Sequence, residues 1–444
     1  MTDKQYDVVI IGGGISGTAL LFLLSRYTDL KRIALIEKLP EIAALNSHGR
    51  NNSQTLHCGD IETNYTLDKA LQVKSSAAML VNYAQQFTQT DSLLYKYPKM
   101  VLGVGKEECQ ILRERFNEFS PHYPSMQLMS AADIEKIEPN VIQGREEEVV
   151  ALGIINEYTA VNFQKLAESF VKQATSNNNS LTEVKLNTRV SSIKQVNDHY
   201  KVTTSSETLK SRFVVVSSGA HSLLFAQNMG YGKEFACLPV AGSFYYTPQK
   251  LNGKVYTVQN DNLPFAAIHG DPDILVDNKT RFGPTALILP VLERGNYSTF
   301  FDFFKSFSFD KGVFKTLGGL LKSSDVRNYI VKNMLFEVPG IRRRLFLKDA
   351  KKIIPDLKLD EISFASGIGG IRPVMIDKKQ AKLHLGEAKI NPGNGIIFNM
   401  TPSPGATSCL YNAEQDLHSI VGQLKCQFNE EMLNNELHQE GHNS

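Results

Sequence analysis

The stretch YDVVIIGGGISGTALLFLLSRYTDLKRIALIEK, residues 6–38, decides the fold. It opens with the apolar run Val8–Ile11, which is typical of a buried parallel strand. Gly12, Gly14 and Gly17 follow at the G-x-G-x-x-G spacing, and the apolar pattern of a helix begins directly after them. In such a motif the first glycine permits a tight turn, the second lets the backbone approach a pyrophosphate, and the third lets the helix pack closely on the strand. The stretch therefore predicts a dinucleotide site at a helix N-terminus.

A second strand and an acidic residue support this interpretation. The second strand is expected over Arg32–Ile36, and Glu37 follows it directly. A carboxylate at this place accepts hydrogen bonds from ribose hydroxyls and would repel a 2′-phosphate. The alternative, an ordinary glycine-rich turn, leaves the order of strand, helix, strand and acid unexplained.

The composition bounds the class of protein. The chain has 444 residues, of which 42% are hydrophobic and 21% charged, and its net charge is +2. These values are typical of a soluble globular protein with two or three domains, and they favour neither a nucleic acid nor an acidic surface as partner. No run of about 18 apolar residues occurs, so no transmembrane helix is predicted, and the first strand begins so early that we expect no signal peptide. The five cysteines are scattered without a C-x-x-C pair, which favours a reduced, cytoplasmic protein.

Three further turns of small residues recur along the chain: SSGA at 217–220, SGIGGIRP at 366–373 and NMTPSPGATSC at 399–409. The first ends an apolar strand, and the last precedes the pattern of a helix over Leu410–Leu424. Only one complete G-x-G-x-x-G occurs, so we expect one cofactor. NAD would leave the distant turns unexplained, whereas FAD requires segments far apart in the chain to close around its isoalloxazine ring. We therefore favour FAD over NAD.

The remaining pattern alternates between helices and strands. Helices are expected over 67–87, 106–119, 131–139 and 162–174, and residues 237–290 read as a sheet that roofs a pocket. The polar loop 43–66 is long enough to carry ligand contacts. Residues 427–444 are polar, and we expect them to be frayed.

One segment, 296–352, differs from the rest in charge. It holds twelve Lys and Arg against five Asp and Glu, a net charge of +7, interspersed with Phe and Leu. Basic residues among apolar ones suit contact with an anionic membrane surface. The alternative is a helical cap with a solvated charged face.

Several segments together resemble the malate:quinone oxidoreductase family, in particular its shorter bacterial branch. These are GGGISGTALLFLLS, NSQTLHCGDIETNYT, ACLPVAGSFYY, VQNDNLPFAAIHGDPD, FGPTALILP, KKIIPDL and NMTPSPGATSCL. The family belongs to the D-amino-acid-oxidase-like flavoproteins. Membership implies non-covalent FAD, oxidation of (S)-malate to oxaloacetate and electron delivery to a membrane quinone. Longer members differ in the run that precedes Asn-Tyr-Thr, where this chain has HCGD at 57–60.

The resemblance implies an α/β fold with a discontinuous Rossmann-type FAD-binding domain and a substrate domain built on a largely antiparallel sheet. We expect the FAD-binding domain over residues 1–75, 150–225 and 353–430. The substrate domain is then expected over 76–149 and 226–352, including the membrane-contact segment, and 431–444 form a polar tail. The implied location is peripheral, on the cytoplasmic side of the bacterial cell membrane.

Oxidation of a secondary alcohol by a flavin requires a base for the hydroxyl proton, a C2 hydride that faces flavin N5, and a clamp for the substrate. His269 is the candidate base. We expect it to end an apolar strand, before a turn in which Asp271 and Asp273 orient the ring or stabilise its charge. The alternatives are His48 or His57 as the base, and a His269 that only caps its turn.

Arg372, in Gly-Ile-Arg-Pro, is the candidate clamp, because a guanidinium fits a carboxylate bidentately. In the wider flavoprotein group an arginine in a Gly-x-Arg-Pro turn meets the substrate acid; an internal ion pair is the alternative. Arg281 is the candidate for the second carboxylate of malate, unless it pairs with Asp273 or Asp277. Tyr65 is a further substrate-pocket residue, and weaker candidates are Tyr256 and Thr285.

The turn at 404–407 is expected beneath the pyrimidine edge of the flavin, where the positive end of the following helix would stabilise the reduced ring. The full set of expected cofactor contacts is Gly12, Gly14, Ser16, Gly17, Glu37, Lys38, Ser53, Gln54, Thr55, Val190, Ser218, Gly219, Gly370, Pro404, Gly405, Ala406 and Thr407. Covalent attachment of FAD to Cys58 or His57 is disfavoured, and no metal site is expected. Two other functions stay open: an FAD-dependent oxidase or dehydrogenase of another 2-hydroxy acid, such as 2-hydroxyglutarate, or of an amino acid, and a non-catalytic flavin-binding sensor.

Overall fold

The computed structural model describes residues 5–177, 180–260, 263, 267–307, 310–384, 388–401 and 404–439. Its first sheet is built around β1 (Gln5–Ile11), which lies parallel to β2 (Arg32–Ile36) on one side and to β11 (Thr208–Val216) on the other. β8 (Leu181–Lys185) and β22 (Ile396–Met400) continue the parallel order at the two ends. The antiparallel additions are β9 (Val190–Val196), β10 (His199–Thr204) and β21 (Ala388–Ile390). Val8–Ile11 are buried, as expected for a strand covered on both faces.

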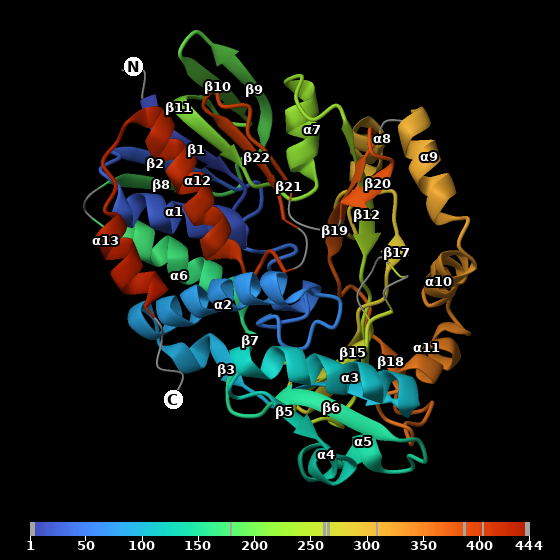
Figure 1. Cartoon of the computed structure of the whole chain (residues 1–444). Helices are drawn as coiled ribbons and strands as arrows, with labels where there is room; N and C mark the ends of the chain where they lie inside the picture. The colour runs from blue at the N-terminus through green and yellow to red at the C-terminus, as the bar shows by residue number, and fades with distance from the viewer. Residues whose placement is uncertain are drawn as a thin grey trace.

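Helices cover this sheet (Figure 1). They are α1 (Ile15–Tyr27), α2 (Leu67–Phe87), α6 (Phe163–Ser176), α7 (His221–Asn228), α12 (Cys409–Leu424) and α13 (Glu430–Leu433). Phe22 of α1 packs between Tyr83 of α2 and Phe170 of α6, with ring centroids 4.9 and 5.7 Å away. Helix α2 thus packs against the first sheet's own helix layer, although the expected domain boundary at residue 75 falls inside it. The expected domain division stays a prediction.

A second, largely antiparallel sheet forms the other half of the molecule. Its order is β18-β13-β16-β15-β14-β4-β6-β5, in which only β14 and β4 pair in parallel among the described residues. The strands are β4 (Lys99–Val104), β5 (Gln127–Met129), β6 (Val149–Ile154), β13 (Tyr245–Pro248), β14 (Lys254–Thr257), β15 (His269–Pro272), β16 (Lys279–Gly283) and β18 (Ser363–Phe364). Helices α3 (Gly105–Phe119), α4 (Ala131–Ile137) and α5 (Pro139–Ile142) lie at its lower end in Figure 1. Parallel and antiparallel layers confirm the predicted fold class.

A third, antiparallel sheet has the order β17-β12-β19-β20. Its strands are β12 (Phe235–Ala241), β17 (Leu287–Ile288), β19 (Ile371–Asp377) and β20 (Lys382–His384). The short strands β3 (Leu94–Lys96) and β7 (Tyr158–Val161) pair separately. Strand β19 carries the second glycine-rich motif and so delivers Arg372.

The basic segment folds into four consecutive helices, which follow one another along one edge of the molecule (Figure 1). They are α8 (Phe300–Phe307), α9 (Lys311–Leu320), α10 (Ser324–Leu335) and α11 (Arg342–Ala350). Among the described residues, no helix is both long enough and apolar enough to cross a bilayer.

The predicted frayed end is wrong for residues 430–438. Leu433 and Leu437 are buried, because α13 and the π-helical turn Asn434–His438 pack beside α1 and α2. Glu436 accepts hydrogen bonds from Arg26 of α1, and Asn82 of α2 donates to the backbone carbonyl of Leu437. Residues 440–444 lie outside the described residues.

Candidate functional site

The first glycine turn leaves no room for side chains. Gly12 has φ +115°, and a Cβ added there would lie 2.3 Å from the carbonyl oxygen of Ser217. A Cβ at Gly17 would lie 2.0 Å from the carbonyl oxygen of Gly12. Both distances are far below van der Waals contact, so only glycine allows α1 to begin this close to β1. The result is a cradle, formed by the turn at the helix N-terminus, in which Gly12, Gly14 and Ser16 line a cavity.

The end of β2 is fixed beside this cradle. The Glu37 carboxylate accepts hydrogen bonds from the backbone N–H of Gly13 (2.7 Å) and of Leu39 (2.9 Å). Lys38 forms an ion pair with Glu293, which lies shortly after β17 of the third sheet. His221 Nδ1 lies 3.6 Å from the same carboxylate. Chain segments about 250 residues apart therefore meet at this end of the site.

A large cavity runs from the cradle to the third sheet, with a volume of about 1190 Å³. This exceeds the roughly 300–1,000 Å³ of ordinary small-molecule pockets, as a cofactor with two nucleotides and a tricyclic ring requires. Of the expected cofactor contacts, Gly12, Gly14, Ser16, Glu37, Lys38, Ser53, Thr55, Val190, Ser218, Gly219, Gly370, Pro404, Gly405 and Ala406 line it. Gly17, Gln54 and Thr407 are not on its wall: the Gln54 amide donates to Asp273 and to the carbonyl of Gly49, and the Thr407 hydroxyl bonds backbone groups of residues 55 and 57.

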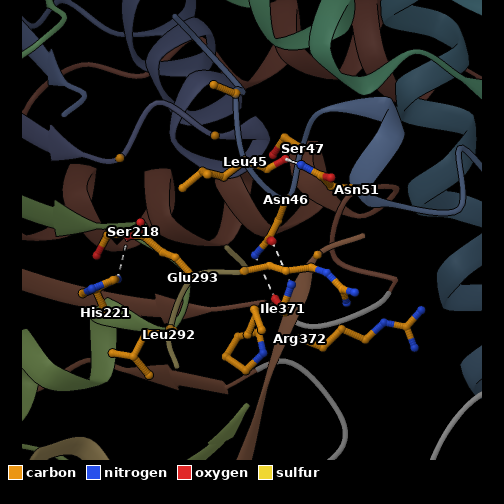
Figure 2. Close-up of a pocket in the computed structure, with 18 of the residues that line it drawn as sticks. Leu45, Asn46, Ser47, Asn51, Ser218, His221, Leu292, Glu293, Ile371 and Arg372 are labelled. Atoms are coloured by element: carbon orange, nitrogen blue, oxygen red, sulfur yellow. Dashed lines mark hydrogen bonds and ion pairs between the residues drawn. The ribbon is translucent and has the colours of Figure 1, made fainter. Parts of the chain in front are cut away.

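The second glycine motif approaches the cavity from the opposite side. A Cβ at Gly370 would lie 2.6 Å from the carbonyl oxygen of Asn51, so this turn packs directly on the polar loop. Asn46 pairs with the backbone of Ile371 through two hydrogen bonds, from Nδ2 to the carbonyl (2.8 Å) and from the N–H to Oδ1 (3.0 Å), which Figure 2 shows. These contacts fix the start of β19 and therefore the position of the next residue, Arg372.

Arg372 lines the cavity, and among the described residues its guanidinium has neither a hydrogen-bond nor an ion-pair partner. Burial lowers its pKa, while the phenols of Tyr329, Tyr256 and Tyr65 act in the opposite direction. A partly buried guanidinium without a carboxylate of its own attracts an anionic ligand. The alternative expectation, an internal ion pair, finds no partner there.

His269 does not end a strand; it begins β15, and Asp271 lies in the same strand rather than in a turn. Residues 264–266 of the expected apolar strand lie outside the described residues. The His269 ring is buried and stacked on Tyr256, with centroids 4.3 Å apart, and its Nε2 lies 3.4 Å from Asp271 Oδ1. It lies behind the cavity wall rather than on it. Burial, followed by the charges of Lys254, Arg281, His57 and Arg372, holds its pKa well below the ordinary value, so the imidazole is neutral.

Asp271 is held by two buried cations. Its Oδ2 lies 3.3 Å from Lys254 Nζ and 3.3 Å from Arg281 Nη2. Arg281 also lies 3.9 Å from Asp273 and donates to the carbonyl of Gly49. The structure therefore shows the alternative that was given for Arg281, an ion pair with Asp273. The Arg281 guanidinium is fully buried and does not line the cavity.

His57 lies on the cavity wall, unlike His269. Its Nδ1 lies 2.6 Å from Glu62 Oε1, and its backbone N–H donates to the hydroxyl of Thr407 (3.2 Å). His48 instead bonds Arg50 and does not line the cavity. Tyr65 and Tyr256 do not line the cavity either. The Thr285 hydroxyl accepts a hydrogen bond from the backbone N–H of Ser243.

Four residues with clear structural roles were not predicted: Asn46, Glu62, Lys254 and Glu293. Three of them pair with groups remote in sequence, which no local pattern reveals. Glu62 is different, because a histidine and a carboxylate five residues apart in a polar loop could have predicted their pairing.

The Cys58 thiol is held in its protonated form. Burial raises the pKa of the Cys58 thiol to about 12, and its S–H faces the carbonyl of Leu56. A thiol held protonated is a poor nucleophile. Within the described part of the chain, no group of three or more His, Cys, Asp and Glu side chains could hold a metal ion.

Comparisons with known proteins agree with this geometry. Among solved structures, the chain is similar to the dithionite-reduced L-α-glycerophosphate oxidase of Mycoplasma pneumoniae with FAD bound, with a TM-score of 0.63 at 20% identity over 96% of this chain and 97% of that one. It is also similar to the glycine oxidase of Geobacillus kaustophilus, with a TM-score of 0.65 at 17% identity over 94% of this chain and 95% of that one. At these identities the likeness concerns the fold alone.

The sequence comparisons show to which family the chain belongs. The chain is 47% identical to the probable malate:quinone oxidoreductase of Campylobacter jejuni, covering 98% of this chain and 100% of that protein. It is 44% identical to the malate:quinone oxidoreductase of Helicobacter pylori, covering 95% of each. The family model described as malate:quinone oxidoreductase matches residues 4–413. The chain therefore belongs to the malate:quinone oxidoreductase family.

Proposed function

We propose that this protein binds FAD non-covalently, oxidises (S)-malate to oxaloacetate and passes the electrons to a membrane quinone. The single observation that carries the substrate side of this proposal is Arg372, a cavity-lining guanidinium without a described protein partner. The family supplies the reaction, and the cavity supplies an anion-binding group where a dicarboxylate substrate needs one.

Gly12 and Gly14, which line the cavity at the N-terminus of α1, would meet the pyrophosphate of FAD, and a Cβ at Gly12 or Gly17 would push α1 away from β1. Glu37 would hold the ribose hydroxyls. The turn at Gly405 and Ala406, ahead of α12, would meet the ring end of the cofactor. The chemistry that bound FAD supplies is acceptance of the C2 hydride.

The chain's own residues do the rest of the work. Arg372 clamps one carboxylate of malate and so fixes the direction of C2. Neutral His269 is the proposed acceptor of the hydroxyl proton, which must cross the wall between its buried ring and the cavity, since an imidazole that is unprotonated near pH 7 has a free acceptor nitrogen. Asp271, 3.4 Å from Nε2, stabilises the imidazolium that forms, and Lys254 and Arg281 hold Asp271 in place.

An anaerobic titration of the purified yellow protein with (S)-malate tests the reaction. We expect (S)-malate to bleach the flavin band, and 2-hydroxyglutarate and amino acids to leave it unchanged. Bleaching by one of these instead would establish the alternative oxidase or dehydrogenase, and no bleaching by any small acid would leave only a flavin-binding sensor. His269→Ala should retain FAD and lose about 10²–10⁴-fold in the rate of bleaching; an unaltered rate would remove the proposed base.

Electron transfer to a quinone dissolved in the membrane requires a surface that reaches it, on the cytoplasmic side. Eleven of the seventeen exposed large hydrophobic side chains in the described residues lie between Tyr297 and Ile341, on α8–α10 and their flanks. Tyr297 is 82% exposed, Phe301 72% and Phe314 59%. An exposed apolar patch within a segment of net charge +7 suits the headgroup region of an anionic bilayer better than water.

Flotation with vesicles of phosphatidylglycerol and phosphatidylcholine tests this surface. We expect the wild-type protein to float with the vesicles, with weaker binding at high salt. The double variant Phe301→Glu/Phe314→Glu should stay in solution. Ile111→Glu on α3 is the matched control, since that side chain is 41% exposed but lies outside the basic segment. Wild-type protein that does not float would make the four helices a solvated cap.

A further inference from the structure

The proposed reaction leaves a proton on a buried ring. Both nitrogens of His269 are buried without a hydrogen-bond partner among the described residues, and its nearest acceptor, Asp271, is itself fully buried. Asp271 is also held by two cations, which make it a poor carrier of a proton. Repeated turnover therefore needs a second group that takes the proton from the site to solvent.

His57 and Glu62 have the geometry for this task. His57 lies on the cavity wall, and Thr55, two residues before it, shares a 2.6 Å hydrogen bond with Tyr256, the phenol that stacks on the His269 ring, so the two imidazoles lie at one end of the site. Its Nδ1 is engaged by Glu62 Oε1 at 2.6 Å, while Nε2 has no partner among the described residues. The bond from its backbone to Thr407 fixes the ring's place beside the turn at 404–407.

Glu62 continues the path away from the cavity. Its side chain keeps 11% of its surface accessible, and Asn64, two residues on, is exposed. Its second oxygen, Oε2, is buried with no partner among the described residues and can therefore accept a proton. Arg115 of α3 donates to the backbone carbonyl of Glu62 and so holds the residue in place.

We infer that His57 and Glu62 form a proton relay, which carries the substrate's hydroxyl proton from the cavity to solvent; this rests on the proposed function. The O–H bond of the substrate breaks, and an N–H bond forms at His269 while the C2 hydrogen leaves with its electron pair as the hydride of the proposed reaction. The proton then passes to Nε2 of His57, the proton on Nδ1 moves to Glu62, and Glu62 releases it to water. Each step breaks one bond to hydrogen and forms another, so no oxidant beyond the proposed one is needed.

The charges around the pair come from several elements. Burial raises the pKa of Glu62, but the hydrogen bond to His57 and then the charges of His57 and Lys99 outweigh it, so the net shift is downward. A carboxylate that is ionised at rest is ready to accept a proton. The charged groups that surround the relay are Asp60 in the same loop, Lys99 on β4, Arg115 on α3, and His269 on β15.

Rapid mixing of the holoenzyme with (S)-malate tests the relay. The reaction is run anaerobically in weak buffer with phenol red, so that bleaching of the flavin and release of the proton are followed in the same shot. Glu62→Gln keeps the shape and the hydrogen bond to Nδ1 but loses the carboxylate. In this variant we expect bleaching within about twofold of wild type, and proton release at least ~10-fold slower than bleaching. In wild-type protein the proton appears together with bleaching, and His57→Gln should also make proton release lag behind bleaching.

The matched control is His199→Gln, because His199 Nδ1 also lies near a carboxylate, 3.1 Å from Asp198, but on β10 away from the cavity. FAD content and the thermal midpoint are measured for every variant, so that a folding defect is recognised. Proton release that keeps pace with bleaching in both relay variants would overturn the inference. A collapse of bleaching itself in both would also overturn it, since His57 would then be the base. Wild-type protein that malate does not bleach would refute the proposed function instead.

Discussion

Two arginines of this protein should respond in opposite ways to the same substitution. Arg372 lies on the cavity wall with no described partner, whereas Arg281 lies 3.3 Å from Asp271 and 3.9 Å from Asp273. Arg372→Met removes a charge that has only the ligand to pair with, so it should weaken ligand binding and leave the free energy of unfolding unchanged or higher. Arg281→Met removes one of the two cations beside Asp271 and the cation beside Asp273, so it should mainly destabilise the fold.

The magnitudes follow from the contacts. A bidentate pair between a guanidinium and a carboxylate that is lost from a cavity costs about 2–4 kcal/mol, which is ~30- to 1000-fold in Kd. Breaking a buried ion pair by removing one partner costs about 3–5 kcal/mol in the free energy of unfolding. Arg372→Lys keeps the charge but not the planar fork and should recover part of the affinity.

Malonate is a suitable probe, because it presents two carboxylates and has no hydroxyl to oxidise. Its Kd is measured from the change in the flavin spectrum of each variant, and the free energy of unfolding from urea titrations. An unchanged malonate Kd in Arg372→Met would refute the assignment of Arg372 as the clamp. A loss of stability in that variant equal to that of Arg281→Met would refute the claim that its charge is unpaired in the fold.

Three further outcomes are expected. Gly17→Ala should cost about 1–3 kcal/mol and lose FAD during purification, because its Cβ would lie 2.0 Å from a backbone carbonyl oxygen; Gly422→Ala, with nothing within 4 Å, should retain the flavin-to-protein absorbance ratio of wild type. The pKa of His269 is lowered in the folded protein, so below about pH 6.5 the unfolded chain binds a proton that the folded chain does not. Urea titrations should therefore show the free energy of unfolding falling by up to about 1.4 kcal/mol for each pH unit below about pH 6.5. His269→Gln should abolish this part of the slope. Asp60→Asn leaves Lys99 buried without its carboxylate and should lower the free energy of unfolding by about 3–5 kcal/mol; an unchanged value would show that the 2.8 Å pair contributes nothing.

The parts of the fold that depend on short-range pattern could be predicted from the sequence. The strand, glycine turn and helix of residues 8–27 follow from steric rules that act within a few residues, and the helix expected over 67–87 is observed at those bounds. The polar loop and the two later small-residue turns do meet at one cavity. This could be anticipated because a long cofactor needs contacts from several segments.

What failed depends on partners far away in the chain. The sequence of residues 430–438 is polar, because only Leu433 and Leu437 in this segment are buried. Their burial depends on contacts with α1 and α2. Arg281 and Arg372 are both arginines near glycine or proline, and only the tertiary structure gives one of them Asp271 and leaves the other unpaired. His269 was expected at a strand end, but the register with β14 and β16 places it at a strand start.

The order of strands in the first sheet also has a consequence for how the protein is made. β1 leaves the ribosome some two hundred residues ahead of its neighbour β11, and β22 and α13 follow β11 by about two hundred residues more. The nascent chain therefore cannot complete the first sheet until β22 has emerged, and its apolar β1 and α1 must wait that long for their partners. A chaperone that shields this N-terminal segment should raise the yield of flavin-loaded protein, and a stop codon ahead of residue 396 should give insoluble product rather than a smaller folded domain.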